Sequence, residues 1–330
     1  MWTILKGLNR RKIFLIFDSF NYDGLSGVDN LESILILLST YNGANYLETQ
    51  LKSLYSQKNV NINILVRDDG STDGTHMILE RWEKRGLLSW YTGRNLKPAL
   101  SFMDLVFSAP PYKYYAFCDQ DDVWEPDKLN IAIERLKKLP NDKEALYCSA
   151  LNIVDEQLKF LKIKKIENIY SLGEALIRNN IVGCTMVLNK KLVDSLREHL
   201  PKYIEMHDSW IYKVCLVIGG NIIVDNLSYI NYRQHTGNVV GARNGYMKKI
   251  KFRIKLLLTN KENKSLKTSK ELLDGYSEKI SISDRELLLK VLQYKNSIKS
   301  KLSLIKDDRM KFKKVRHKIF FLIDVFFERF

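Results

Sequence analysis

The pattern that most constrains the fold is a regular alternation of strand-like and helix-like segments between residues 33 and 139. Short apolar runs predict strands, and apolar residues three or four positions apart predict the helices between them. Strands separated by helices of about ten to fifteen residues are typical of βαβ units and a mostly parallel sheet. The predicted strands are residues 33–39, 62–66, 88–91 and 114–118, and the predicted helices are residues 47–55, 75–84, 99–107 and 126–139.

Three of the predicted strands end in clusters of turn residues and carboxylates. The clusters are residues 39–43, 68–73 and 119–122. In open α/β sheets, ligands bind at the carboxyl ends of the strands. We therefore expect the three clusters to line a single cleft.

The third cluster is the most informative, because Asp119, Asp121 and Asp122 crowd into four positions after an apolar run. Unpaired like charges at this density repel each other. Mg²⁺ or Mn²⁺ is commonly held by one or two carboxylates together with phosphate oxygens, so a cation that carries a diphosphate would explain the cluster. A solvated acidic turn before a helix is the alternative that these residues leave open.

The spacing of residues in the second cluster resembles that of a calcium-binding loop. Residues 69–80 match an EF-hand loop, with ligand-type residues at positions 1, 3, 5 and 12 and glycine at position 6. An EF-hand needs a helix before that loop, whereas residues 61–67 alternate as a strand. We therefore expect an Asp-Gly turn that leads into the next helix, and no calcium loop.

Sequence-wide features favour a cytosolic globular protein. The 330 residues predict about two domains, and a hydrophobic fraction of 45% is ample for a core. The four cysteines are at least 30 residues apart in apolar settings, which favours buried reduced thiols. The apolar run at residues 13–17 is too short to span a membrane, and it lacks a small-residue cleavage site, so secretion is not expected.

The positive charge is concentrated in the last 90 residues. Residues 241–330 hold 24 Lys and Arg against 10 Asp and Glu, which accounts for +14 of the formal net charge of +15. Gly237, Gly241 and Gly245 punctuate the sequence at this change of composition. We therefore predict an N-terminal extension at residues 1–30, a globular α/β domain at 31–240 and a basic helical region at 241–330.

The basic region contains two helix signals. The sequence Ser283-Asp-Arg-Glu286 predicts a capping box that opens one helix. A second helix combines an apolar stripe with a basic flank, which favours an anionic membrane surface. Packing of the stripe on the catalytic domain remains open, and nucleic acid is not expected because no recognised binding module is present. The stripe is Phe312, Val315, Ile319, Leu322, Phe326 and Phe330, and the flank is Lys311, Lys313, Lys314, Arg316 and Lys318.

Six short motifs follow one another between residues 35 and 235. They are residues 35–43 (LILLSTYNG), 66–74 (VRDDGSTDG), 117–129 (FCDQDDVWEPDKL), 183–188 (GCTMVL), 207–210 (HDSW) and 232–235 (YRQH). In this order they resemble the family 2 glycosyltransferases of GT-A fold. More narrowly, they are similar to the rhamnosyltransferase-like branch that builds bacterial cell-wall and capsular polysaccharides. The resemblance covers about two thirds of the chain and implies a Rossmann-like nucleotide-sugar-binding domain.

The resemblance implies a donor site built on the first three motifs. Ser39 and Tyr41, with Asn42 in the same turn, match positions that hold the donor's base, and the tyrosine ring stacks on it. Asp69 matches the carboxylate that accepts the N–H of a pyrimidine imide, a role that suits an acceptor-only group. Asp119 matches a partner of the donor's sugar or ribose.

The resemblance also implies a metal site for Mn²⁺ or Mg²⁺. Asp121 matches the direct ligand of a cation that neutralises the diphosphate leaving group. Arg233 and His235 could bind the metal or the diphosphate, and a structural role for the histidine is as well supported by its position after a strand. Asp122 is expected to cap the following helix.

The fifth motif supplies the expected general base. Asp208 matches the carboxylate that takes the proton of the acceptor hydroxyl during direct displacement. The family usually carries Glu-Asp or Asp-Asp here, whereas this chain has His207-Asp208, and His207 is taken as a substrate-binding candidate. A helix cap before residues 209–217 is the alternative role for Asp208.

Two classes of function follow. In the first, the chain is an inverting, metal-dependent glycosyltransferase on the inner face of the cell membrane, with a growing, lipid-linked bacterial surface glycan as acceptor. The resemblance favours dTDP-rhamnose as donor, and UDP-sugars of GlcNAc, Gal or Glc are the alternative. In the second class, an inactive GT-A domain serves as a scaffold or membrane adaptor.

Overall fold

The computed structural model describes residues 31–167, 171–235, 263–312 and 314–330. The predicted N-terminal extension, the three glycines near residue 241 and Lys313 lie outside the described residues. Among the described residues, none of the helices has the length and apolar character needed to cross a bilayer.

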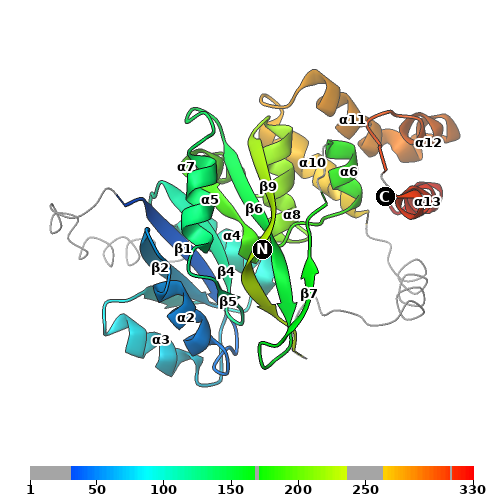
Figure 1. Cartoon of the computed structure of the whole chain (residues 1–330). Coiled ribbons are helices and arrows are strands. Elements are labelled where there is room, and N and C mark those ends of the chain that lie inside the picture. Colours follow the sequence, from blue (N-terminus) through cyan, green and yellow to red (C-terminus); the bar gives the residue numbers. More distant parts are fainter. Residues whose placement is uncertain (1–30, 168–170, 236–262, 313) are drawn as a thin grey trace.

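A nine-stranded sheet forms the centre of the protein (Figure 1), in the order β3-β2-β1-β4-β8-β6-β9-β5, with β7 paired to β6. Strands β1 to β4 are parallel, β8 runs antiparallel between β4 and β6, and β9 is parallel to β6. The predicted mostly parallel α/β sheet is therefore confirmed. The strands are β1 (Ser33–Thr40), β2 (Asn61–Asp68), β3 (Ser89–Thr92), β4 (Tyr114–Asp119), β5 (Val123–Trp124), β6 (Ala145–Val154), β7 (Phe160–Lys164), β8 (Val187–Asn189) and β9 (Asn221–Arg233).

Helices cover both faces of this sheet. Helices α2, α3 and α5 pack on one face, and α4, α7 and α8 pack on the other. The predicted helix at residues 126–139 is shorter at both ends, because Pro126 precedes the first helical turn. The helices are α2 (Leu47–Tyr55), α3 (Thr75–Glu83), α4 (Lys97–Ser108), α5 (Lys128–Leu136), α6 (Leu172–Ile177), α7 (Lys190–Glu198), α8 (His207–Val217), α10 (Lys264–Tyr276), α11 (Ile282–Gln293), α12 (Ile298–Ile305) and α13 (Val315–Phe326).

The burial of β1 explains its continuous apolar sequence. Leu35 and Leu37 face the core under α4, whereas Ile34, Ile36 and Leu38 face the core under α2, and all five are fully buried. A strand that is buried on both faces reads as an uninterrupted apolar run, because neither alternate set of side chains meets water.

The C-terminal helices lie together at one end of the molecule (Figure 1) and extend the core rather than hanging free of it. Leu272 of α10, Leu288 of α11 and Phe321 of α13 belong to the same buried cluster as Ile211 of α8. Helix α11 is capped by Ser281, whose side chain accepts from the Asp284 N–H. The capping box predicted at Ser283 is therefore wrong, because the extended residue that begins the helix lies two positions earlier.

The predicted apolar stripe of the last helix divides between two environments. Phe330 is 4% exposed, and its ring packs against Tyr294 and Phe321. Val315, Ile319 and Phe326 are 76%, 50% and 56% exposed. The stripe is thus partly a packing face and partly an apolar surface.

Candidate functional site

A cleft of about 840 Å³ opens where β1, β2 and β4 end. All three polar clusters that follow these strands contribute to its wall, as the sequence predicted. The opposite wall comes from β7, α6 and the start of α8. Of the predicted site residues, Ser39, Tyr41, Asp69, Asp119, Asp121, His207, Asp208 and His235 line the cleft, and Asn42 and Arg233 are not part of its lining.

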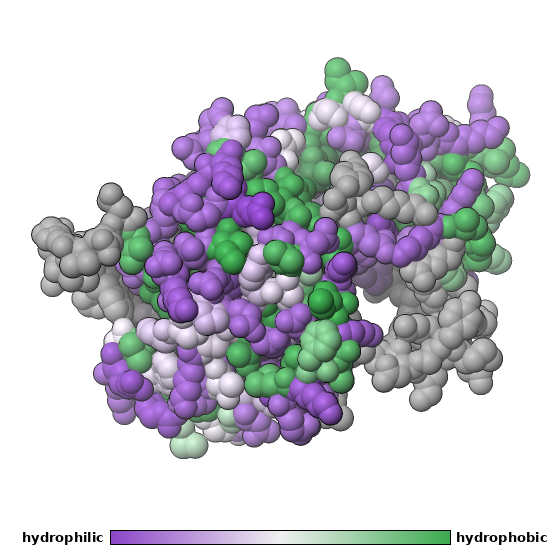
Figure 2. Space-filling model, viewed as in Figure 1, coloured by the Kyte–Doolittle hydropathy of each residue, from purple (hydrophilic) through white to green (hydrophobic). Residues whose placement is uncertain are grey.

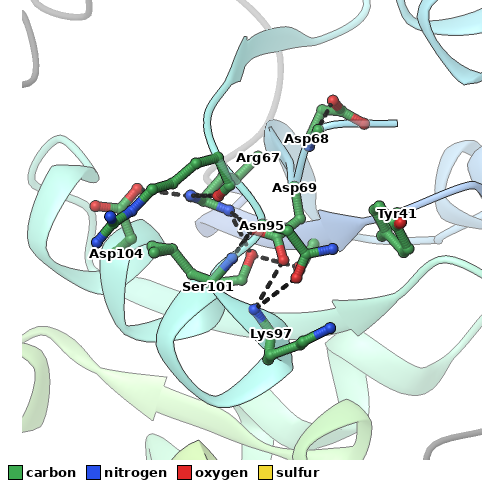
Figure 3. Close-up of polar contacts among 12 residues, drawn as sticks. Tyr41, Arg67, Asp68, Asp69, Asn95, Lys97, Ser101 and Asp104 are labelled. Atoms are coloured by element: carbon green, nitrogen blue, oxygen red, sulfur yellow. Dashed lines mark hydrogen bonds and ion pairs between the residues drawn. The ribbon is translucent and has the colours of Figure 1, made fainter. Parts of the chain in front are cut away.

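Asp69 lies at one end of the cleft and is held by several donors (Figure 3). Its Oδ1 accepts from Arg67 and from the Leu96 N–H at 2.8 Å, and its Oδ2 accepts from the Lys97 N–H at 2.9 Å. A carboxylate offers about four acceptor positions. One position on Oδ2 therefore stays available for a ligand N–H.

Arg67, which the motif comparison did not single out, organises this end of the cleft. Its side chain is 1% exposed, and its Nε donates to Asp104 Oδ2 at 2.8 Å while its Nη1 donates to Asp69 and to Ser101 Oγ at 3.1 Å. Figure 3 shows Arg67 reaching between Asp104 and Asp69. Its position inside a predicted strand gave no sign of this role, because a buried arginine normally needs carboxylate partners that are distant in sequence.

The turn after β1 is fixed by residues from β2 and β4. Asn42 has a positive φ of 48°, and its Oδ1 accepts from the Thr72 N–H at 2.9 Å, so it shapes the loop instead of facing the cleft. Gln120 accepts from the Tyr41 N–H at 2.9 Å and donates to the Tyr41 carbonyl at 3.1 Å. The Tyr41 ring remains 45% exposed, across from Asp69 in Figure 3.

The calcium-like loop is an Asp-containing turn, as expected. The element before it is strand β2, and Asp73 Oδ1 accepts from the Thr75 N–H at 3.0 Å, where α3 begins. The neighbouring Asp68 is fully buried and accepts from Gly70, Ser71 and Thr92. These carboxylates are occupied by the turn itself.

The acidic loop after β4 is electrostatically strained. Burial, followed by the neighbouring Asp121 and Asp208 carboxylates, raises the pKa of Asp119 to about 7. Burial, followed by Asp121 and Asp119, raises the pKa of Asp122 well above its usual value. The loop therefore concentrates more negative charge than its surroundings compensate, which is the condition that a bound cation relieves.

The described residues around this loop fit a hard divalent cation. Asp121 Oδ2 lies 2.6 Å from His235 Nε2, so both predicted metal ligands reach one point of the cleft. Ligand atoms of Asp119, Asp122 and Cys184 also lie within 4.8 Å of one another. Burial raises the pKa of the Cys184 thiol well above its usual value, which makes it a poor ligand for Mg²⁺ or Mn²⁺. The aspartate oxygens with His235 form the better-matched set.

Arg233 supports the acidic loop from behind. Its Nε donates to the Asp121 carbonyl at 2.9 Å, and its backbone N–H donates to Asp122 Oδ1 at 3.2 Å. Its guanidinium lies 5.0 Å from the ring of Tyr46, which also stacks on His235 at 4.6 Å. In this structure Arg233 positions the loop that carries the predicted metal ligand and does not itself line the cleft.

Asp122 does not cap the following helix, contrary to expectation. Helix α5 begins at Lys128 with Asp127 as its N-terminal cap residue, and Asp122 is fully buried below the cleft. Its Oδ2 has no hydrogen-bond partner among the described residues. A carboxylate that enters the core directly after a two-residue polar turn cannot be distinguished by sequence from one that caps a helix.

Asp208 lies on the opposite wall of the cleft, in the first turn of α8 rather than at its cap, which is Met206. Its Oδ1 accepts from Asn179 Nδ2 at 3.0 Å and from the Ser209 N–H at 2.5 Å. Burial raises the pKa of Asp208 to about 6, although the backbone donors of Ser209 and Gly183 oppose this shift. The side chain is therefore an ionised base at neutral pH with an unusually high proton affinity.

His207 is part of the core beside this base. It is 3% exposed, and its ring lies 4.1 Å from that of Phe102 and 5.3 Å from that of Phe117. Burial lowers its pKa to about 3, so the imidazole is neutral. A Cβ at Gly183 would lie 2.2 Å from His207 Nε2, which explains why glycine begins the GCTMVL segment.

Comparison with protein families identifies the domain that carries this cleft. Residues 35–185 match the family Glycosyl transferase family 2. Among solved structures, S. aureus TarS in complex with UDP-GlcNAc superposes with a TM-score of 0.54 at 16% identity, covering 89% of this chain and 80% of TarS. At this level of identity the similarity establishes the GT-A fold alone.

Sequence relatives are bacterial glycosyltransferases. The chain is 29% identical over 236 residues to the dTDP-rhamnosyl transferase RfbG of Shigella flexneri, covering 65% of this chain and 77% of RfbG. It is 28% identical over 185 residues to an uncharacterized glycosyltransferase of Rickettsia prowazekii, covering 54% of this chain and 57% of that protein.

Proposed function

We propose that this chain, a glycosyltransferase with a family 2 domain of GT-A fold, transfers a sugar from a nucleotide diphosphate sugar to an acceptor hydroxyl with inversion of configuration. The observation that carries the proposal is the arrangement of one cleft. Asp119 and Asp121 come from the end of β4 and the loop after it, the separate carboxylate of Asp208 comes from the first turn of α8, and all three line this cleft. A leaving group held at the first two and a hydroxyl activated at the third would face each other across the sugar.

The donor's base would bind between Tyr41 and Asp69. The exposed Tyr41 ring offers a stacking surface. The free acceptor position on Asp69 would take the imide N–H of the base, and its other donors hold the carboxylate at the angle required.

The acidic loop would hold the diphosphate through a divalent cation. When bound by Asp121, with His235 and Asp119 nearby, Mn²⁺ or Mg²⁺ would neutralise the charge that develops on the leaving nucleoside diphosphate. The chain's own contribution is positional, because Arg233 fixes the backbone of this loop and Gln120 ties the loop to the turn that carries Tyr41.

Asp208 would act as the general base. The bond from the acceptor oxygen to the sugar's anomeric carbon forms as the bond from that carbon to the diphosphate breaks, and the hydroxyl proton moves to the Asp208 carboxylate. A base with a pKa of about 6 is ionised at neutral pH and still accepts a proton readily. Direct displacement from the face opposite the leaving group gives inversion.

The favoured donor is dTDP-rhamnose. Its support is the similarity to RfbG, a dTDP-rhamnosyl transferase, over 77% of that protein's length. Asp69 cannot distinguish thymine from uracil, because both present the same imide N–H. A UDP-sugar of GlcNAc, Gal or Glc is therefore the competing donor.

The acceptor would be a growing bacterial surface glycan on a lipid carrier, met at the cytoplasmic face of the membrane. Supporting this, apolar patches lie among hydrophilic side chains at the end formed by α12 and α13 (Figure 2). On α13, the exposed Val315, Ile319 and Phe326 lie beside Lys318, and Lys311 precedes the helix. Basic residues near an anionic surface contribute about 1 kcal/mol each.

A donor screen tests the proposal. The full chain is incubated with Mn²⁺ or Mg²⁺ and each of dTDP-rhamnose, UDP-GlcNAc, UDP-Gal and UDP-Glc, and release of the nucleoside diphosphate is measured with and without EDTA. We expect metal-dependent release from dTDP-rhamnose above all.

A binding titration with dTDP and UDP in the presence of Mn²⁺ or Mg²⁺ tests the competing class, an inactive scaffold. The presence of both Asp121 and Asp208 in one cleft argues against a degenerate site. Failure to bind dTDP or UDP in the presence of either metal would favour the scaffold.

A further inference from the structure

Two lysines in the described part of the chain are almost completely buried, and their surroundings differ. Lys128 is 1% exposed, and its Nζ lies 3.5 Å from the centre of the Trp124 ring. Asp122 adds a favourable charge interaction with Lys128. The aromatic face is the main contact of this ammonium group, because its Nζ has no hydrogen-bond partner among the described residues.

Lys213 on α8 interacts with the charges of Glu205 and Asp208 only at longer range. It is 6% exposed and lines the cleft, and its Nζ donates to Ser209 Oγ at 2.7 Å. No carboxylate of the described residues lies within ion-pair distance of this ammonium group. One neutral hydroxyl leaves two of the three donors of the ammonium group unused by any described side chain. A buried cation in this state is costly unless an anion joins it.

Two nearby cations, of which only Arg178 lines the cleft, do form ion pairs. Arg178 is neutralised by Glu174 and Glu167, and Lys264 pairs with Glu205. Lys164, at the end of strand β7, lines the cleft without an ion pair among the described residues. Lys164 and Lys213 are thus two cations that face one cavity and form no ion pair among the described residues.

We propose that Lys213 and Lys164 form a subsite for a phosphate group of the acceptor, beside the base Asp208. The assignment to the acceptor rests on the proposed function, because both lysines belong to the wall that carries Asp208, and both interact with its charge. The donor candidates Tyr41, Asp69 and Asp121 follow β1, β2 and β4 instead. A lipid-linked glycan carries such a phosphate in its diphosphate link.

Burial supports this reading of Lys213. It lowers the pKa of the ammonium group to about 8, so Lys213 is still protonated at pH 7 but has lost much of its stabilisation by water. An arriving phosphate would replace that lost solvation with charge-assisted hydrogen bonds. Lys213 donates to Ser209 in the first turn of α8, and the N-terminus of this helix favours a negative group nearby.

The first experiment uses the full chain in EDTA and titrates it with inorganic pyrophosphate at pH 7, by calorimetry. Without a divalent cation, the carboxylates of the donor wall repel pyrophosphate, so binding has to use the lysines. We expect saturable binding that weakens about tenfold or more in Lys213→Met and by less in Lys164→Ala. Absence of pyrophosphate binding to the wild-type chain overturns the proposal. A pyrophosphate affinity equal to that of the wild type in both variants also overturns it.

The chain supplies a matched control. Lys128→Met also replaces a buried lysine with an apolar side chain of similar length, but Lys128 does not line the cleft. Its pyrophosphate affinity should equal that of the wild type. Lys164 lies on an exposed strand, so the Lys164→Ala variant should fold. It therefore still tests the proposal if Lys213→Met does not fold.

A second titration separates an acceptor subsite from a donor subsite. The chain is saturated with dTDP and Mg²⁺ and titrated with inorganic phosphate, and the dTDP affinity of each variant is measured separately. Phosphate should still bind, Lys213→Met should weaken it, and dTDP affinity should not change. A tenfold loss of dTDP affinity in Lys213→Met would assign the lysine to the donor. Failure of the wild-type chain to bind dTDP would instead count against the proposed function, and the metal-free titration stays informative in that case.

Discussion

The two walls of the cleft differ in how their buried charged side chains are compensated. On the wall that follows β1, β2 and β4, Arg67 and Asp69 meet within one network of ion pairs and backbone donors. On the wall formed by β7, α6 and α8, Lys213 donates to a hydroxyl but forms no ion pair among the described residues. The Arg67–Asp69 end of the first wall is thus compensated before any ligand arrives, which suits a constant nucleotide, whereas the acidic loop of the same wall carries excess negative charge that a cation would relieve. The second wall is electrostatically incomplete, which suits a substrate that supplies the missing charge itself.

The largest effect should follow a change on the second wall. Asp208→Asn keeps the shape of the side chain and removes the proposed base, so kcat should fall about 10²- to 10⁴-fold. Donor affinity should be nearly unchanged, because a general base acts in the transition state. Steady-state rates and dTDP-sugar titrations check both. If donor affinity falls while kcat is nearly unchanged, Asp208 is a binding residue and not the general base. The two walls would then not differ in the way described above.

On the first wall, Asp121→Asn removes a charged ligand and should lower turnover about 10²- to 10³-fold with the fold intact. Unlike Asp208→Asn, this variant should also need more Mn²⁺ for half-maximal activity, because the lost carboxylate acts through the metal. Metal titrations of activity, with circular dichroism as a folding control, check the expectation. Near-normal turnover with unchanged metal dependence would exclude Asp121 as a ligand.

The compensation of the buried Arg67 charge on the first wall can be tested by measuring the free energy of unfolding. Asp104→Asn takes one carboxylate from the buried Arg67, which should lower the free energy of unfolding by about 3 kcal/mol. Lys213→Met on the second wall removes a buried charge that forms no ion pair among the described residues, so it should be neutral or stabilising. Urea unfolding of both variants measures the difference. Equal destabilisation would mean that the two walls are compensated alike.

The pH dependence should reflect Asp208. Because only the ionised carboxylate accepts a proton, the rate should fall about tenfold per pH unit below a pKa of about 6. Asn179 donates to this carboxylate and favours its charged form, so Asn179→Ala should move the acid limb to higher pH by less than about one unit. A loss of kcat without any shift of the limb would indicate a purely structural role for Asn179.

The smallest effect concerns α13. Because Phe321, Val325 and Phe330 are core residues, removing the helix would damage the fold, and surface substitutions are the better test. Ile319→Asn combined with Phe326→Asn should reduce sedimentation with anionic vesicles a few-fold and leave donor hydrolysis unchanged. Met77→Asn, at a residue 71% exposed on α3, is the control. Equal vesicle binding by both proteins would contradict a membrane role for this surface.

Local sequence patterns were sufficient for the first half of the sheet. Strands buried on both faces leave continuous apolar runs such as β1, and the polar turns that follow them mark the cleft. The second half was not predicted, because β6 and β7 form an antiparallel pair with no intervening helix signal, and β7 is exposed along its length. Exposed strands lose the apolar periodicity on which such predictions depend.

The site residues divide in the same way. Those in short motifs, such as Asp121 and Asp208, could be named from the sequence through a family resemblance. Gln120, Asn179 and Lys213 could not, because their importance depends on partners that folding brings together. Burial also changed what a residue does, since the neutral core imidazole of His207 has the same sequence signature as an exposed, titrating one.

Strand β9 has a consequence for how the protein is made. It delivers Arg233 to the carbonyl of Asp121, 112 positions earlier in the chain, and it pairs with β5 directly after the acidic loop. On the ribosome, β1 to β4 emerge long before β9 does. Contacts of such long sequence separation form late and slowly. In the nascent chain, the acidic loop therefore lacks its contacts with Arg233 and β9 until β9 is synthesised. We expect activity only after translation has passed that strand.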